Sequence, residues 1–200
     1  MKDEREKYER PWGWPVKRKV LEGFSPLGSP VHRAVPKLLC ACDFLVPLGS
    51  SVLAMEDGEV VSVKQDSQFG GNDLRDGRRA EDSDFYYTGN RIEINHGSEE
   101  YSAYEHLAFN GSLVKPGDKV KKGDKIAVTG YTGLMAHLGP HLHVERFIWL
   151  GPEEEDYTTI KINWEAENLL YTHYLWDLKK WLLVGDSREL KVKNGVHKKS

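Results

Sequence analysis

The sequence predicts an all-β fold, a compact antiparallel barrel or sandwich, and two observations support this prediction. Between Leu38 and Val128 the chain consists of short runs rich in Val, Ile, Tyr and Thr, separated by Gly, Pro, Asp and Asn. Such runs are typical of strands joined by frequent turns. The segment LVKPGDKVKKGDKIAVTG is especially regular, because Pro116-Gly117 and Lys122-Gly123-Asp124 bend the chain around two short strands.

The remaining elements follow from local patterns along the chain. In order, strands are expected in residues 38–47, 51–55, 58–65, 91–96, 101–107, 124–130 and 139–147. Residues 66–89 are too polar and too rich in Gly and Asp to form a core element, so they predict a long inserted loop that carries specificity. In the segment WEAENLLYTHYLWDLKKWLL, apolar residues recur at spacings of three and four, which predicts an amphipathic helix over about 165–183.

Two hundred residues suggest one domain with extensions. We expect an N-terminal extension over 1–30, one folded unit over 31–150 with the insertion at 66–89, and a C-terminal extension over 151–200. Trp12 and Trp14 are expected to tether the first extension to the body of the domain.

Composition excludes several classes of partner. The 28 basic and 31 acidic residues nearly cancel, so the net charge of −3 leaves no electrostatic footprint for nucleic acid or an anionic membrane. No apolar run is long enough to span a bilayer, and the N-terminus lacks the pattern of a signal peptide. The chain as written is therefore expected to be cytoplasmic or to be released by a non-Sec route. Composition does not predict the oligomeric state.

The stretch GPHLHVERF places two histidines one residue apart in an expected strand. Because side chains alternate along a strand, His141 and His143 should project from the same face, and Tyr104 and His106 should do so in the segment YSAYEHL. Asp43 is a lone carboxylate in an otherwise apolar strand, where it should be paired or metal-bound. Imidazole and carboxylate together suit a divalent metal such as zinc.

Two cysteines and one glutamate flank these candidates. Alternation places Cys40 and Cys42 opposite to Asp43, so we interpret them as core thiols and not as metal ligands. Glu145 shares the face of the histidine pair and either accepts a hydrogen bond from one of them or forms a surface salt bridge.

Five elements follow one another along the chain: CDF, INHG, YEHL, GYTG and GPHLHVE. In sequence and order, the region from about Val31 to Phe147 resembles the lysostaphin-type, LytM-like family of zinc metalloendopeptidases, which are peptidoglycan hydrolases. The resemblance implies a compact two-layer antiparallel β domain with a groove across one sheet. It also implies that Asp43 and His143 bind one zinc ion per chain, while His106 and His141 are unligated catalytic imidazoles. Tyr104 is a secondary candidate for contact with the oxyanion.

The first zinc ligand departs from the common family pattern HxxxD, because Leu39 stands where that histidine would be. The stretch GSPVHRAVPKLLCACDF resembles a variant in which the histidine precedes an insertion, and it makes His32 the third zinc ligand. The alternative is that His32 is an exposed loop residue. His137 is expected in a loop near the groove, and His96 at the turn that ends a strand.

The resemblance implies an endopeptidase that cleaves peptide cross-links of peptidoglycan with metal-activated water. One alternative is a catalytically degenerate domain that binds the cell wall or a partner protein, for which Leu39 is the best argument. A second is a carrier domain, since VKPGDKVKKGDKIAVTG resembles the hairpin of biotinyl and lipoyl domains, although no modifiable lysine motif stands at its tip.

Overall fold

The computed structural model describes part of the chain. The described residues are 12–17, 20, 23–25, 32, 34–68, 70, 88–133, 139–151, 156–162 and 164. The helix predicted over about 165–183, most of the insertion at 66–89, and His137 lie outside them.

Ten strands and one short 3-10 helix, η2 (Pro36–Leu38), are described. The strands are β1 (Gly23–Ser25), β2 (Cys42–Leu45), β3 (Ser51–Leu53), β4 (Gly58–Lys64), β5 (Asn90–Asn95), β6 (Glu100–Ser112), β7 (Lys119–Val120), β8 (Lys125–Thr129), β9 (His141–Trp149) and β10 (Tyr157–Thr159). All pairings between these strands are antiparallel, which confirms the predicted all-β fold.

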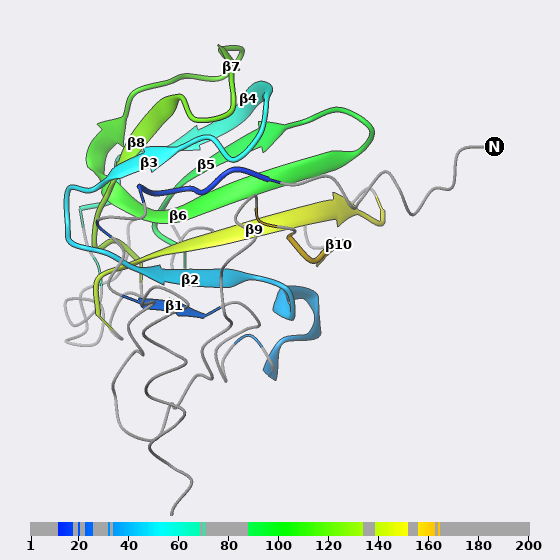
Figure 1. Cartoon of the computed structure of the whole chain (residues 1–200), viewed down its shortest axis with the longest axis horizontal. Helices are drawn as coiled ribbons and strands as arrows, with labels where there is room; N and C mark the ends of the chain where they lie inside the picture. The colour runs from blue at the N-terminus through cyan, green and yellow to red at the C-terminus, as the bar shows by residue number, and fades with distance from the viewer. Residues whose placement is uncertain are drawn as a thin grey trace, which may run out of the picture.

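The strands form one continuous sheet around the long strands β6 and β9 (Figure 1). Its main order is β1-β2-β9-β6-β5-β4-β7, and β10 pairs with the C-terminal part of β9. The thirteen-residue β6 also leaves this path, because its C-terminal part pairs with β8, and β8 in turn pairs with β3. The sequence predicted most strands closely, since β2 to β5, β8 and β9 fall within or beside the expected segments. β6 continues to Ser112, beyond the expected end at residue 107, and β7 lies between the two turns predicted in LVKPGDKVKKGDKIAVTG.

The register divides the central sheet into two chemically different faces. Residues opposite one another on adjacent antiparallel strands point to the same side. Tyr104 is paired with both Ile92 and Val144, and Phe44 is paired with Leu142. All of these residues are buried in the hydrophobic core, together with the buried side chains of β3 and β8. The opposite face therefore carries the residues that alternate with the core.

Segments from both predicted extensions contribute to this body. Trp12 is fully buried, and Gly13 N–H donates to the Met55 carbonyl at 2.8 Å. Trp14 stacks on Trp164 with ring centroids 5.2 Å apart. The tryptophans therefore anchor the N-terminal segment, as expected, and β1 and β10 add strands to the sheet from either side of residues 31–150.

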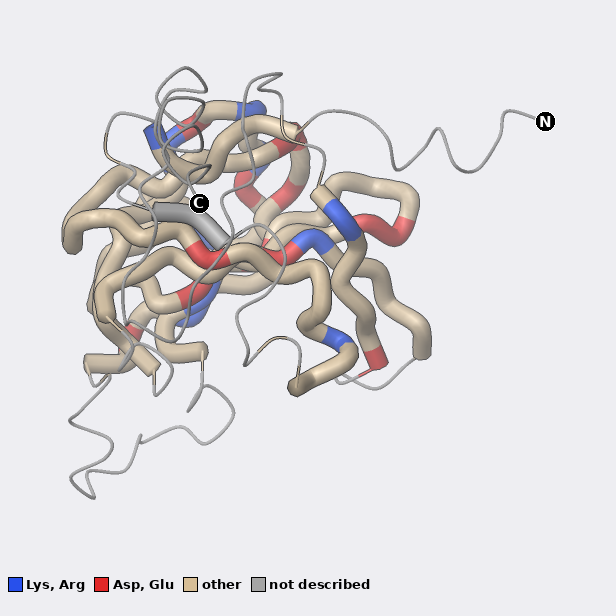
Figure 2. Tube along the Cα trace, turned by 60° about the horizontal axis from the view of Figure 1, so that its bottom comes forward, with Lys and Arg blue, Asp and Glu red and all other residues tan. Residues whose placement is uncertain are grey.

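Charges of both signs are spread over the described backbone. Figure 2 shows acidic and basic residues next to one another along the trace instead of one sign gathered on one face. Among the described residues, no helix has the length and apolar character needed to cross a membrane.

Candidate functional site

The candidate site lies on the face of the central sheet opposite the core. Asp43 on β2 is paired with His143 on β9, and His143 is paired with Glu105 on β6, so these three side chains form one row across the sheet. His141 lies two residues before His143 and, as alternation predicts, shares this face with it. All four residues are buried, although each is polar.

His32, Asp43 and His143 form a compact donor cluster. One potential ligand atom from each lies within 4.8 Å of the others. His143 Nδ1 is 2.9 Å from Asp43 Oδ1, and His32 Nε2 is 3.5 Å from Asp43 Oδ2. His32 is only 4% exposed, which overturns the alternative that it is an exposed loop residue. Leu39, at the position of the common family histidine, is 52% exposed and contributes nothing to the cluster.

The protonation of the cluster follows from its partners. Burial lowers the pKa of His32 to about 4, despite the attraction of Asp43, so this imidazole is neutral at pH 7. Burial alone would raise the pKa of Asp43, but the hydrogen bond from His143 and the charges of nearby histidines hold it well below its usual range. An ionised carboxylate and a neutral imidazole are the forms in which both groups bind metals.

His143 is held between carboxylates through both ring nitrogens. Nδ1 donates to Asp43 and Nε2 donates to Glu145 Oε1 at 3.1 Å, so the ring carries both protons. Burial lowers the pKa of His143, but Glu105, Asp43 and Glu145 outweigh this effect and raise it well above 6.5. Glu145 is therefore a buried acceptor for His143 and not a surface salt bridge.

A bulge in β6 turns His106 toward the same face. The register shifts between Asn90 and Ile92 of β5, so that one residue, Arg91, lies opposite both Glu105 and His106. His106 has a positive φ of 60°, which is uncommon for a residue other than glycine. Its ring centroid consequently lies 4.5 Å from that of His141 and 6.2 Å from that of His143.

Both histidines predicted to be catalytic are anchored in the same way. His106 Nδ1 is 2.8 Å from the Thr132 carbonyl, and His141 Nδ1 is 2.8 Å from the Gly139 carbonyl. A carbonyl only accepts, so Nδ1 carries the proton in each ring. In the neutral tautomer the lone pair then lies on Nε2, and His141 Nε2 lies 3.9 Å from Asp43 Oδ1. Burial holds the pKa of His106 well below its usual value, so that ring is neutral.

The prediction for Tyr104 is wrong. The bulge breaks the alternation between Tyr104 and His106, so the tyrosine points into the core on the other face. Its hydroxyl accepts a hydrogen bond from Met55 N–H at 2.8 Å, and its side chain is fully buried. Tyr104 is therefore a core residue and is not available for contact with an oxyanion.

The cysteines and His96 lie away from the cluster. Cys42 is part of the hydrophobic core, and both cysteines are free thiols. His96 Nδ1 is 2.8 Å from the Asp57 carbonyl and Nε2 is 2.8 Å from Ser102 Oγ, which gives it a structural role at the end of β5.

Two site residues were missed by the sequence analysis. Glu105 is buried on the site face, with Oε2 4.0 Å from His143 Nε2, and Arg91 forms ion pairs with Glu105 and Glu145. A buried strand that contains Glu beside His was a signal for Glu105. No local signal indicated Arg91, because its position depends on the register of β5 against β6.

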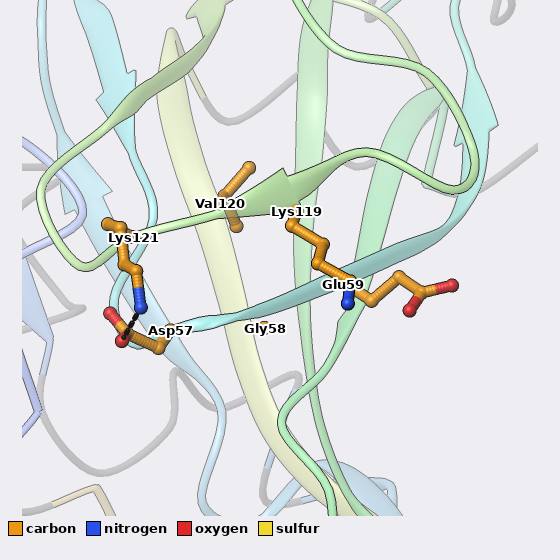
Figure 3. Close-up of a pocket in the computed structure, with 6 residues that line it drawn as sticks. All are labelled: Asp57, Gly58, Glu59, Lys119, Val120 and Lys121. Atoms are coloured by element: carbon orange, nitrogen blue, oxygen red, sulfur yellow. Dashed lines mark hydrogen bonds and ion pairs between the residues drawn. The ribbon is translucent and has the colours of Figure 1, made fainter.

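Two open pockets lie on the described surface. One, of about 360 Å³, is lined by Thr132, whose carbonyl contacts His106 Nδ1, and by Gln68 and Gly70 from the start of the insertion, but by no residue of the cluster itself. The other, of about 320 Å³, lies between β4 and β7 and is lined by no residue of the cluster. Figure 3 shows Lys121 of this second pocket paired with Asp57, with Lys121 Nζ 2.8 Å from Asp57 Oδ2.

Comparison with known proteins identifies the family. The model of peptidase family M23 matches residues 40–149. The chain belongs to peptidase family M23. This membership confirms the family predicted from the motifs CDF, YEHL and GPHLHVE.

Several known proteins are similar to the chain. It is 35% identical over 130 residues to the peptidoglycan DD-endopeptidase ShyB of Vibrio cholerae, which covers 64% of this chain and 25% of ShyB. It is 39% identical over 103 residues to an uncharacterized metalloprotease of Haemophilus influenzae, covering 52% of this chain and 17% of that protein. A crystal structure of a zinc-containing peptidase from Vibrio cholerae is 31% identical, with a TM-score of 0.48, covering 70% of this chain and 37% of that one. The chain thus spans about a quarter or less of the length of these two curated relatives.

Proposed function

We propose that this M23 domain is a zinc-dependent endopeptidase that cleaves peptide cross-links of peptidoglycan. The observation that carries the proposal is the buried cluster of His32, Asp43 and His143 beside two histidines, His106 and His141, each held at Nδ1 by a backbone carbonyl. Family membership supports a peptidase, and the name of ShyB supports peptidoglycan as the substrate class.

The donor set fits zinc. Two imidazoles and one carboxylate are ligands that zinc accepts, and three protein ligands are typical of catalytic sites, which keep a fourth position open. Asp43 is buried and ionised, and a zinc ion that displaces the Nδ1 proton of His143 would find one carboxylate and two imidazole lone pairs. We propose that His32, Asp43 and His143 hold one zinc ion per chain. Bound there, zinc would polarise a peptide carbonyl and increase the acidity of a water molecule.

The chain's own groups supply the proton transfers. The neutral imidazole of His106 is suited to take a proton from the attacking water at Nε2, while its Nδ1–H remains on the Thr132 carbonyl. His141, anchored likewise on Gly139, presents a second Nε2 that can stabilise the developing negative charge once protonated, or pass a proton to the leaving amine.

The pocket lined by Thr132 is proposed to receive one side of the peptide. Thr132 also anchors His106 through its carbonyl, and the start of the insertion contributes Gln68 and Gly70 to the pocket wall. A peptide bond held at the cluster would then have its flanking residues in this pocket, where the start of the insertion would contact them.

The test is digestion of purified peptidoglycan followed by mass spectrometry of the fragments. Zinc-loaded protein should convert cross-linked fragments into monomers, chelator-treated protein should not, and returned zinc should restore cleavage. His32→Ala should lose both zinc and cleavage, because two protein ligands hold zinc weakly. Binding to peptidoglycan without any cleavage by the zinc-loaded protein would favour the degenerate binding module instead.

A further inference from the structure

Arg91 on β5 lies among three carboxylates on the site face. Its Nη2 is 2.7 Å from Glu93 Oε1 and 3.8 Å from Glu145 Oε2, and its Nη1 is 3.3 Å from Glu105 Oε1. The side chains of Glu105 and Glu145 are 5% and 2% exposed, so both charges are held away from water. A buried carboxylate is costly unless it is paired, which makes Arg91 important to both.

Two of these carboxylates face the same atom of His143. Glu145 Oε1 accepts from Nε2 at 3.1 Å, and Glu105 Oε2 lies 4.0 Å from it. On the other side of the ring, Nδ1 faces Asp43 and the metal cluster. The His143 imidazole therefore has Asp43 on its Nδ1 side and the carboxylates that pair with Arg91 on its Nε2 side.

Regular register alone brings Glu105 opposite Arg91 and His143, and the bulge of β6 then adds His106 to the same face. Arg91 therefore lies opposite both a partner carboxylate and a catalytic candidate. Glu105, His143 and Glu145 are also close enough to hold a metal ion. The guanidinium already pairs with both carboxylates, so a second cation there would be repelled.

We propose that Arg91 is a positioning residue: it holds Glu145 and Glu105 against Nε2 of His143, which fixes the ring with Nδ1 toward the zinc. The inference rests on the proposed function. A ligating histidine commonly donates its second ring N–H to a carboxylate, and loss of such a partner typically costs about 10–100-fold in metal affinity. Arg91 acts one contact further out, through the two carboxylates.

The direction of the effect separates positioning from simple charge. Arg91 is a cation near the proposed zinc, so by charge alone its removal should strengthen zinc binding. If Arg91 positions His143, its removal should weaken binding, because Glu145 loses the partner that holds it in place. Arg91→Met is therefore expected to bind zinc about tenfold more weakly or worse.

The experiment measures zinc affinity by competition with a chromogenic chelator on the full chain. Arg91→Met, Arg91→Lys, Glu145→Ala and Glu145→Gln are compared with wild type. Lysine keeps the positive charge but lacks the several N–H donors of a guanidinium, so Arg91→Lys should bind zinc more tightly than Arg91→Met but less tightly than wild type. Glutamine keeps an acceptor for Nε2–H, so Glu145→Gln should bind more tightly than Glu145→Ala.

Lys121→Met is the matched control, because it also removes one cation from an ion pair but lies outside the cluster. Nitrogen-15 NMR of the zinc-loaded protein gives a second readout. The His143 Nε2–H proton should be strongly deshielded in wild type and in Lys121→Met, and shifted in Arg91→Met. If Arg91→Met does not fold, Arg91→Lys still tests the inference through both readouts.

The outcomes are distinct. Unchanged or tighter zinc binding by Arg91→Met, with wild-type NMR signals, would overturn the inference and leave the proposed function intact. Failure of wild type to bind zinc would overturn the proposed function and this inference with it. Weaker binding by Arg91→Met with partial recovery in Arg91→Lys would support the inference.

Discussion

Replacing His106 by Asn should abolish peptide hydrolysis while leaving zinc bound. Asparagine tolerates a positive φ better than most residues, and His106 has a φ of 60°. Its amide can also donate to the Thr132 carbonyl, which His106 Nδ1 contacts at 2.8 Å. The substitution therefore preserves the backbone and an anchoring donor but removes the titratable Nε2.

The expected magnitudes separate this variant from His143→Ala. General acid–base catalysis contributes about 10²–10⁴-fold, equivalent to about 3–5 kcal/mol of barrier, so His106→Asn should lose that much activity. Zinc should stay, because His106 is not in the donor cluster. His143→Ala removes one of three proposed ligands. If about 10–16 kcal/mol of zinc binding is shared among them, the loss is about 3–5 kcal/mol, or roughly 10²–10⁴-fold in affinity.

Both quantities are measured on the same preparations. Zinc is counted by elemental analysis after dialysis against a chelator, and hydrolysis is followed on purified cross-linked fragments of peptidoglycan. Lys121→Met, a substitution outside the cluster, is prepared in the same way as a control and should match wild type in both zinc content and hydrolysis. Equal zinc loss in the His106 and His143 variants would show that the two roles are exchanged, and full activity in His106→Asn would refute proton transfer by that residue.

Three further predictions address the core, the protons and the insertion. Tyr104→Phe should destabilise the domain by about 1–3 kcal/mol in denaturant unfolding, because Met55 N–H loses its buried acceptor, yet leave zinc content and cleavage unchanged. Zinc affinity should rise by about tenfold for each unit of pH increase below the pKa of His143, because zinc must displace a proton from that ring and its pKa lies well above 6.5. His32, with a pKa of about 4, is already neutral and adds no further pH dependence. A zinc affinity that does not change with pH would contradict this prediction. Replacing residues 71–87 by a short linker should keep zinc bound and change which peptides of a panel are cleaved, and an unchanged cleavage profile would show that the insertion carries no specificity.

Much of the fold was predictable because it depends on local chemistry. Alternating β-branched residues and turn residues indicated β2 to β9, and alternation within β9 placed His141 and His143 on one face. Asp43 was conspicuous as a charge in an apolar strand. These signals depend on neighbours in sequence, and the structure reproduces their geometry.

The missed features depend on contacts between distant strands. The bulge at His106 involves no glycine, so nothing in YSAYEHL indicates that alternation fails between Tyr104 and His106. Arg91 joins the site only because β5, β6 and β9 lie side by side in a particular register. His32 was indicated by resemblance to a family variant, since it lies eleven positions before Asp43 and no strand periodicity links the two.

The central claim is that one zinc ion is held by His32, Asp43 and His143. A zinc K-edge absorption spectrum of the protein, with its zinc content counted beforehand, tests this most directly. The account predicts about one zinc per chain coordinated by nitrogen and oxygen only. Cys42 faces the core and the cluster contains no thiol, so a spectrum showing sulfur ligands, or a zinc-loaded protein with no histidine coordination, would contradict the account.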